Sequence, residues 1–143
     1  MKYLLDTNVL KEVGRATPHE NVLAWLNTVD DAELAISAIS VREIWKGIER
    51  KRRKDAVVGS RLEAGGRAMF DAYRGRILPV DEAIAQRWGM MLAESDRHIE
   101  DTGLAATAYV HDLIVVTRNE ADFAARRVTI LNPFKQIARR AKR

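Results

Sequence analysis

Residues 113–116, with the sequence Leu-Ile-Val-Val, constrain the fold of this chain more than any other segment. Four large aliphatic residues in a row, two of them valine, are typical of a central parallel strand buried on both faces. Further strands are expected at residues 3–5, 33–39, 76–80 and 128–131, with segments of helical apolar spacing between them. Strands that alternate with helices predict βαβ units. We therefore expect an α/β fold with three layers, α/β/α, around a mostly parallel sheet of four or five strands.

The segments between these strands predict the helices. Helices are expected at residues 8–14, 18–28, 40–54, 55–73, 81–95, 119–125 and 133–142, and another from Asp101 to about Tyr109. The helix at 40–54 is expected to begin at Ser40, because Ser40 followed by Glu43 matches a capping box. In the helix at 18–28, Trp25 belongs to the apolar stripe and is expected in the core. Gly65 and Gly66 are expected to weaken or bend the helix at 55–73.

Charge and composition narrow the class of protein. The 143 residues are expected to form one domain, residues 1–143, and the net charge of +4 comes with basic clusters at residues 50–54 and 135–143. These clusters predict contact with a polyanion, although a solvated helix face and a loose tail would give the same pattern. No apolar run is long enough to cross a bilayer, and residues 3–12 do not form a signal peptide. We expect no membrane contact and a cytoplasmic location. The absence of cysteine excludes disulfides and thiolate metal sites.

Four acids follow strands or open the next helix: Asp6, Glu43, Asp101 and Asp122. Such positions lie at one edge of a parallel sheet, where ligands bind, so the four carboxylates can converge. Two carboxylates about 4 Å apart repel by roughly 4 kcal/mol at an effective dielectric constant near 20, so a cluster needs a cation. Oxygen ligands of this kind suit Mg²⁺ or Mn²⁺. No cysteine is present and the histidines fall at no metal-ligand spacing, which argues against zinc.

Three of these acids also have an ordinary explanation. Glu43 completes the predicted capping box, Asp101 fits a helix N-cap, and Asp122 fits a first-turn acid that interacts with the helix dipole. Asp6 has no equally clear helix-start pattern. Thr7 and Asn8 stand beside it and are expected to support its carboxylate through hydrogen bonds.

Five short motifs, in order along nearly the whole chain, resemble those of the PIN-domain family. They are residues 5–10 (Leu-Asp-Thr-Asn-Val-Leu), residues 39–44 with Gly47, Asp101 followed by residues 105–108, residues 117–123, and residues 131–134. The chain is most similar to the VapC/FitB type, the toxin half of bacterial toxin–antitoxin pairs.

The resemblance implies a Mg²⁺- or Mn²⁺-dependent ribonuclease. Its catalytic acids would be Asp6, Glu43, Asp101 and Asp122. Asp6 and Asp101 would bind the metal directly, and the other two would bind it through water or orient the nucleophile. A second metal, recruited with the substrate, would stabilise the leaving oxygen. The supporting polar residues would be Thr7, Asn8, Thr117 and Asn119.

The chain departs from the family pattern at two positions, and the resemblance also implies binding partners. Asn119 stands where some relatives have an acid, and Gly103 stands where relatives usually have a larger residue, which is expected to loosen the start of that helix. The residues expected to contact the RNA backbone are Arg118, Arg50, Arg52 and Arg53. The expected partners are RNA, a VapB-like antitoxin whose arginine would enter the acid cluster, and a second copy of the chain or a toxin–antitoxin hetero-oligomer.

Two alternatives remain open from the sequence. One is a catalytically silent module that keeps the PIN fold and binds RNA or protein. The other is an aspartyl-phosphate phosphatase or receiver domain, which also places an Asp after its first strand. Asn8 stands where that class needs a second acid, and no lysine follows the strand that ends at Val116.

Overall fold

The computed structural model describes residues 1–136 and contains a five-stranded parallel sheet. Its strands are β1 (Tyr3–Leu5), β2 (Leu34–Ser37), β3 (Ile77–Leu78), β4 (Ile114–Val116) and β5 (Ile130–Leu131). They lie in the order β3-β2-β1-β4-β5, and every neighbouring pair is parallel. In the centre, Leu4 pairs with Ala35 on one side and Val115 on the other. The predicted α/β class and parallel sheet are confirmed.

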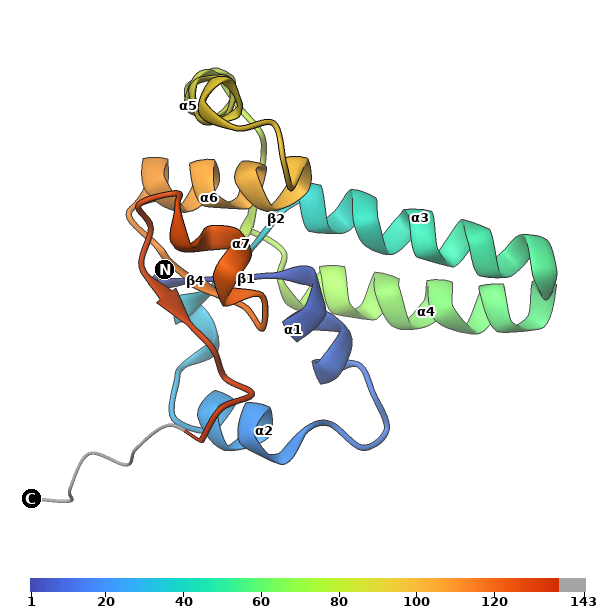
Figure 1. Ribbon diagram of the computed structural model, residues 1–143. Helices are drawn as coiled ribbons and strands as arrows, with labels where there is room; N and C mark the ends of the chain where they lie inside the picture. Colours follow the sequence, from blue (N-terminus) through green and yellow to red (C-terminus); the bar gives the residue numbers. More distant parts are fainter. Residues whose placement is uncertain (137–143) are drawn as a thin grey trace, which may run out of the picture.

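Helices cover both faces of this sheet (Figure 1). They are α1 (Thr7–Val13), α2 (Glu20–Leu26), α3 (Ala38–Lys54), α4 (Ala56–Ala72), α5 (Glu82–Glu94), α6 (Ile99–His111) and α7 (Glu120–Ala124), with a short 3-10 helix η1 (Asp31–Glu33). Helices α5, α6 and α7 pack on one face, and α1 and α2 pack on the other. The predicted three layers are therefore present. No helix among residues 1–136 is long and apolar enough to cross a membrane.

Strand β1 separates two hydrophobic cores because its side chains alternate between the faces of the sheet. Leu4 packs with the α5–α6 side, whereas Tyr3 and Leu5 pack with the α1–α2 side. Trp25 of α2 meets the Tyr3 ring edge-on, with the ring centroids 5.1 Å apart. Its side chain is buried, which confirms its predicted place in the core.

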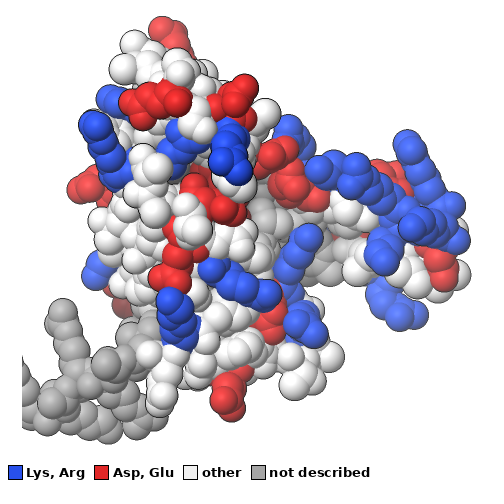
Figure 2. Space-filling view, viewed as in Figure 1, with Lys and Arg blue, Asp and Glu red and all other residues white. Residues whose placement is uncertain are grey.

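Helices α3 and α4 form a hairpin that projects from the body of the molecule (Figure 1). Asp55 joins them and caps α4 by accepting hydrogen bonds from the backbone of Val57 and Val58, at 3.0 and 3.2 Å. The helices approach so closely that a Cβ on Gly59 would lie 2.6 Å from the Arg52 Cα. Lys and Arg side chains gather over the far end of the hairpin (Figure 2).

The two glycines Gly59 and Gly65 of α4 are expected to respond oppositely to alanine. Gly59→Ala should lower the free energy of unfolding by about 1–3 kcal/mol, because the new Cβ meets the α3 backbone. Gly65→Ala should raise it by about 0.5–1 kcal/mol, because nothing lies within 4 Å of its Cβ position and alanine favours helix. Urea denaturation measures both. Equal shifts for the two variants would contradict the observed helix contact.

Several predicted boundaries were wrong. Helix α3 begins at Ala38 with Ser37 as its N-cap, so Ser40 and Glu43 do not form a capping box. Helix α6 begins at Ile99, which places Asp101 in its first turn instead of at the N-cap. No helix begins at Pro133: residues 133–136 form a turn, and the remainder of the predicted closing helix lies outside the described residues.

Helix α4 continues through Gly65 and Gly66, so these glycines do not end it, and their predicted weakening of the helix stays a prediction. The prediction for Gly103 needs correction. Gly103 does not loosen α6 but is buried inside it, and a Cβ there would lie 2.6 Å from Ile39 Cδ1 and 2.8 Å from the Trp88 ring. Its missing side chain lets α6 pack closely against the start of α3 and against α5.

Candidate active site

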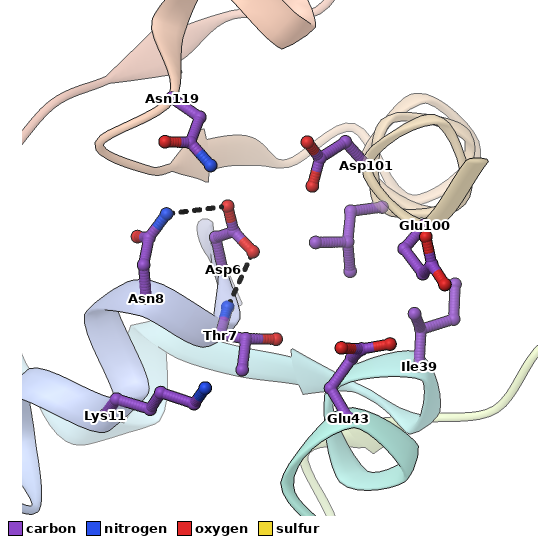
Figure 3. A pocket seen from close by; sticks show the side chains of 10 residues that line it. Asp6, Thr7, Asn8, Lys11, Ile39, Glu43, Glu100, Asp101 and Asn119 are labelled. Carbon is purple, nitrogen blue, oxygen red and sulfur yellow. Dashed lines mark hydrogen bonds between the residues drawn. The ribbon is translucent and has the colours of Figure 1, made fainter. Parts of the chain in front are cut away.

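A pocket of about 220 Å³ opens at the carboxyl ends of β1 and β4 (Figure 3). Its lining comes from the first two turns of three helices, with Asp6 before the first of them, and from the loop after β4: Asp6, Thr7, Asn8, Lys11, Ile39, Glu43, Glu100, Asp101, Leu104 and Asn119. The convergence predicted for Asp6, Glu43 and Asp101 is therefore observed. Figure 2 shows acidic side chains gathered along the middle of the same face.

Asp6 is the most tightly held of these acids. It ends β1 and is only 4% exposed. Its Oδ1 accepts a hydrogen bond of 2.6 Å from the backbone of Thr7, so Asp6 is also the N-cap of α1. Its Oδ2 accepts from the Thr117 hydroxyl at 2.8 Å and from the Asn8 amide at 3.2 Å. Burial raises the pKa of Asp6, and these hydrogen bonds offset part of that effect.

The predicted supporting residues form one network around Asp6. Asn8 lies 3.4 Å from the Thr117 hydroxyl and accepts a hydrogen bond of 3.3 Å from the backbone of Arg118. The backbone of Asn119 donates to the Thr117 hydroxyl at 2.9 Å, while its side chain faces the pocket. The ends of β1 and β4 are thereby locked together, which fixes the direction of the Asp6 carboxylate.

Asp101 faces Asp6 from the first turn of α6 (Figure 3). Burial, the nearby charge of Asp6 and a hydrogen bond and charge interaction with Asp122 together raise the pKa of Asp101 to about 7. Close carboxylates repel each other, so one of them retains a proton when no cation is bound. The arrangement of the two carboxylates therefore favours the binding of a cation between them.

Glu43 stands across the pocket in a different environment. Its carboxylate is one-quarter exposed and pairs with Arg42 at 3.0 Å and Lys46 at 3.7 Å, both from its own helix. The same Arg42 guanidinium reaches Glu100 at 2.8 Å. Glu43 and Glu100 are therefore partly neutralised by the chain itself, whereas no Lys or Arg side chain among residues 1–136 lies at ion-pair distance from Asp6 or Asp101.

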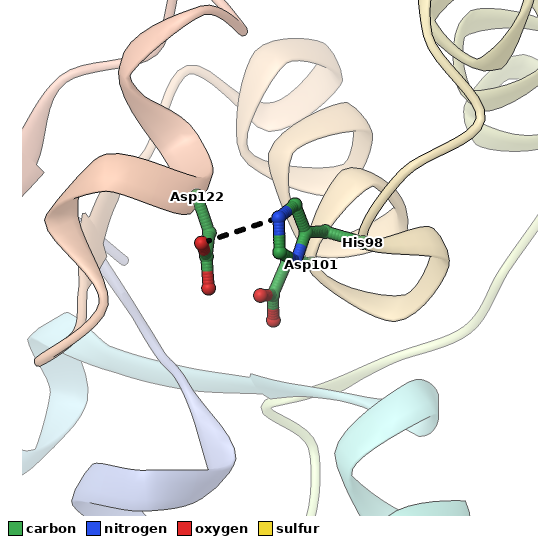
Figure 4. Close-up of side chains that lie close together, drawn as sticks. All are labelled: His98, Asp101 and Asp122. Atoms are coloured by element: carbon green, nitrogen blue, oxygen red, sulfur yellow. Dashed lines mark ion pairs between the residues drawn. The ribbon is translucent and has the colours of Figure 1, made fainter.

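Asp122 lies behind Asp101 and is joined there by His98, a residue that sequence reasoning set aside (Figure 4). His98 Nε2 is 3.4 Å from Asp122 Oδ1. Donor atoms of His98, Asp101 and Asp122 all lie within 4.8 Å of one another. The sequence spacing of the histidines did not indicate a metal ligand, but the fold brings His98, which directly precedes α6, close to these two acids.

Two further residues near the acids were not predicted. Lys11 lines the pocket, and its position four residues after Thr7, one turn along α1, gave a signal that could have found it. Arg126 is 7% exposed and donates to three backbone carbonyls: Met91 at 2.8 Å, Ser95 at 2.9 Å and Arg97 at 3.2 Å. It fastens the segment before α6 to the end of α7, and no local pattern marks it.

The predicted basic residues do not form one surface. Arg52 pairs with Glu49 and Glu63 and braces the two helices of the hairpin. Arg50 and Arg53 are exposed, and within residues 1–136 no acidic side chain lies at ion-pair distance from them. Arg118 is exposed beside the site, and its guanidinium lies 4.1 Å from the centre of the Phe134 ring.

The acids at the pocket fit a hard divalent cation. Asp6, Glu43 and Asp101 offer carboxylate oxygens around the pocket. Burial is the largest cause of the raised pKa of Asp101, and the repulsion from Asp6 and Asp122, which a cation would relieve, adds to it. Mg²⁺ and Mn²⁺ take oxygen ligands of this kind and keep several waters.

The raised pKa of Asp101 should make the metal-free protein less stable as pH rises. Between about pH 4 and about pH 7 the folded state holds more protons than the unfolded state, so the free energy of unfolding falls. Because the Asp101 carboxylate is only partly buried, we expect a loss of about 1–2 kcal/mol. Urea unfolding in EDTA across this window, compared with Asp101→Asn, isolates this carboxylate. A parent protein that gained stability relative to the variant as pH rose would contradict the expectation.

Comparison with known proteins identifies a family and individual relatives that this chain resembles. The sequence matches the family model described as PIN domain over residues 3–129. It is 36% identical over 138 residues to Toxin FitB of Neisseria gonorrhoeae, covering 92% of this chain and 97% of that protein. It is 33% identical over 141 residues to VapC ribonuclease Y4jK of Sinorhizobium fredii, again covering 92% and 97%. The crystal structure of FitAcB from Neisseria gonorrhoeae superposes with a TM-score of 0.76 at 35% identity, covering 92% of this chain and 98% of that one.

Proposed function

The chain belongs to the PIN-domain family, in its VapC/FitB type, and we propose that it is a metal-dependent ribonuclease that serves as the toxin of a toxin–antitoxin pair. The observation that carries this proposal is the convergence of Asp6 and Asp101, with Glu43 across the pocket and Asp122 behind. Relatives named as a toxin and as a ribonuclease support the assignment.

Asp6 and Asp101 would hold Mg²⁺ or Mn²⁺ directly, and Glu43 and Asp122 would bind it through water or orient the attacking water. When bound, the cation supplies Lewis-acid activation of the phosphodiester and a lowered pKa for water. The reaction is hydrolysis: water adds to phosphorus, the phosphorus–oxygen bond to the leaving nucleotide breaks, and the leaving oxygen takes up a proton.

The supporting residues position these acids. Thr7, Asn8 and Thr117 donate three hydrogen bonds to the Asp6 carboxylate and so restrict its rotation. Thr7 also donates through its hydroxyl to Ser40 at 3.0 Å, which ties the start of α1 to α3, the helix of Glu43. A carboxylate held in this way loses little rotational freedom when it binds a ligand.

Basic residues would receive the RNA. Lys11 extends along the pocket wall, where its ammonium offsets the repulsion between the acids and a phosphate. Arg118 lies beside the site, and Arg50 and Arg53 present exposed guanidinium groups on the hairpin. Arg52 is excluded from this set because it already pairs with Glu49 and Glu63. Contacts of this kind weaken as salt rises.

The partner of this toxin would be a VapB-like antitoxin. Within the chain, Arg42 already bridges Glu43 and Glu100 through its guanidinium, so the pocket accepts an arginine at its rim. An antitoxin arginine that entered between Asp6 and Asp101 would replace the cation with a bidentate ion pair. A second copy of the chain would complete a toxin dimer or a larger toxin–antitoxin assembly.

Cleavage of RNA by purified protein without its antitoxin tests the proposal. We expect cleavage with Mg²⁺ or Mn²⁺ and none with EDTA. Sequencing the 5′ ends of the fragments would identify the cleaved sites. Cleavage that persists in EDTA would remove the metal-dependent proposal. RNA binding without cleavage in either metal would instead favour a silent module with the PIN fold.

A further inference from the structure

His98 adds a nitrogen donor to a group of acids whose other donors are oxygens (Figure 4). We propose that His98, Asp101 and Asp122 form a second cation subsite beside the pocket, in which the imidazole makes the protein take Mn²⁺ in preference to Mg²⁺. Asp101 is shared, because it also lines the pocket with Asp6. This inference rests on the metal-dependent function proposed above and specifies which ion serves it.

The distances between the donor atoms suit one ion. His98 Nε2 and Asp122 Oδ1 are 3.4 Å apart, and the donors of all three residues lie within 4.8 Å of one another. Ligands about 2.1 Å from an octahedral ion are about 3 Å apart when adjacent and about 4.2 Å apart when opposite. The 3.4 Å between His98 Nε2 and Asp122 Oδ1 is close to the adjacent spacing, and side-chain rotation would bring the three donors around one ion.

The backbone directs the imidazole toward the acids and away from the helix end. His98 precedes α6 with φ 53° and ψ 59°, and its side chain makes no capping hydrogen bond to α6. Arg126 holds the carbonyl of the preceding residue, Arg97, at 3.2 Å and that of Ser95 at 2.9 Å. The segment that carries His98 is therefore fastened next to α7, the helix that carries Asp122.

The chemistry of the donor set decides between ions. Imidazole nitrogen suits transition metals, whereas Mg²⁺ binds oxygen ligands and gives up its waters reluctantly. Mn²⁺ accepts both kinds of donor, so a bond to His98 should increase the affinity for Mn²⁺ more than the affinity for Mg²⁺. The competing explanation is that His98 and Asp122 form only an ion pair, which needs no metal and predicts no nitrogen coordination.

Pulsed electron paramagnetic resonance of the Mn²⁺-loaded protein separates these explanations. We expect ¹⁴N modulation from a directly bound imidazole in the parent protein and in the control His111→Asn, at the other end of α6, and its loss in His98→Asn. Asparagine tolerates the left-handed backbone at this position, so this variant keeps the fold. Calorimetry should show Mn²⁺ affinity at least about tenfold weaker in His98→Asn, with Mg²⁺ affinity changed less than about threefold.

The outcomes distinguish the proposed role of His98 from the proposed metal-dependent ribonuclease. Mn²⁺ binding without ¹⁴N modulation in the parent, or with unchanged modulation in His98→Asn, would overturn the role of His98 and leave the metal-dependent nuclease standing. A protein that bound neither ion and cleaved no RNA would overturn both. Thermal unfolding of the metal-free variants, expected to match the parent within about 3 °C, excludes loss of fold as the cause.

Discussion

Replacing Asp101 with asparagine is expected to reduce metal-dependent RNA cleavage by about a thousandfold or more, while the metal-free protein becomes more stable. Activity falls because Asp101 is shared by the pocket and the His98–Asp122 group, so its loss weakens both places where a cation would bind. Stability at neutral pH rises because asparagine removes a carboxylate whose charge is disfavoured by burial and repelled by Asp6 and Asp122. A gain in stability together with a loss of activity distinguishes a functional residue from one retained for the fold.

A matched control is available on the same helix. Asp112 follows the last turn of α6, is exposed and has φ 54°, a conformation that asparagine accepts. Asp112→Asn makes the same change in charge far from the pocket and should leave cleavage within about twofold of the parent. Fragment yield over time with Mg²⁺ and with Mn²⁺ measures both variants. Cleavage by Asp101→Asn at the rate of Asp112→Asn would refute the acid site.

Replacing Arg126 with methionine is expected to cost about 2–4 kcal/mol in the free energy of unfolding. Methionine has similar length but no donor, so the carbonyls of Met91, Ser95 and Arg97 lose their charged partner inside the protein. The segment that positions His98 and Asp101 against Asp122 would lose its attachment, so we also expect Mn²⁺ affinity to fall about tenfold or more.

The control for Arg126 is Arg61→Met, an exposed position on α4, which should change stability by less than about 0.5 kcal/mol. Urea unfolding gives the stability of both variants, and calorimetry gives the Mn²⁺ affinity of the folded protein. If Arg126→Met lost stability but bound Mn²⁺ as tightly as the parent, Arg126 would serve the fold without positioning the site.

The sequence predicted the strands and the convergence of the acids because both follow from local patterns. Apolar runs end where β1 and β4 end, and the polar residues that follow them meet because neighbouring parallel strands present the same ends. The start of α3 was misplaced because Ser37 and Ser40 both fit a helix cap, and only the backbone shows that Ser37 is used. The catalytic roles of the four acids remain predictions.

His98 and Arg126 could not be found from local patterns. His98 has a left-handed backbone and lies before α6, so its approach to Asp122 depends on how the loop folds over α7. Arg126 binds backbone carbonyls more than 25 residues away in the sequence. No spacing rule connects a side chain with carbonyl groups of a distant loop.

The contact between β1 and β4 determines how late in synthesis the acid site can form. The hydroxyl that holds the Asp6 carboxylate belongs to Thr117, which is 111 positions further along the chain. During synthesis the α3–α4 hairpin can form early from neighbouring segments, but β1 must wait for β4 to be made before it gains that neighbour. A nascent chain therefore contains Asp6 long before it contains Thr117, the residue that orients the Asp6 carboxylate. The acid site therefore cannot form until Thr117 has been synthesised.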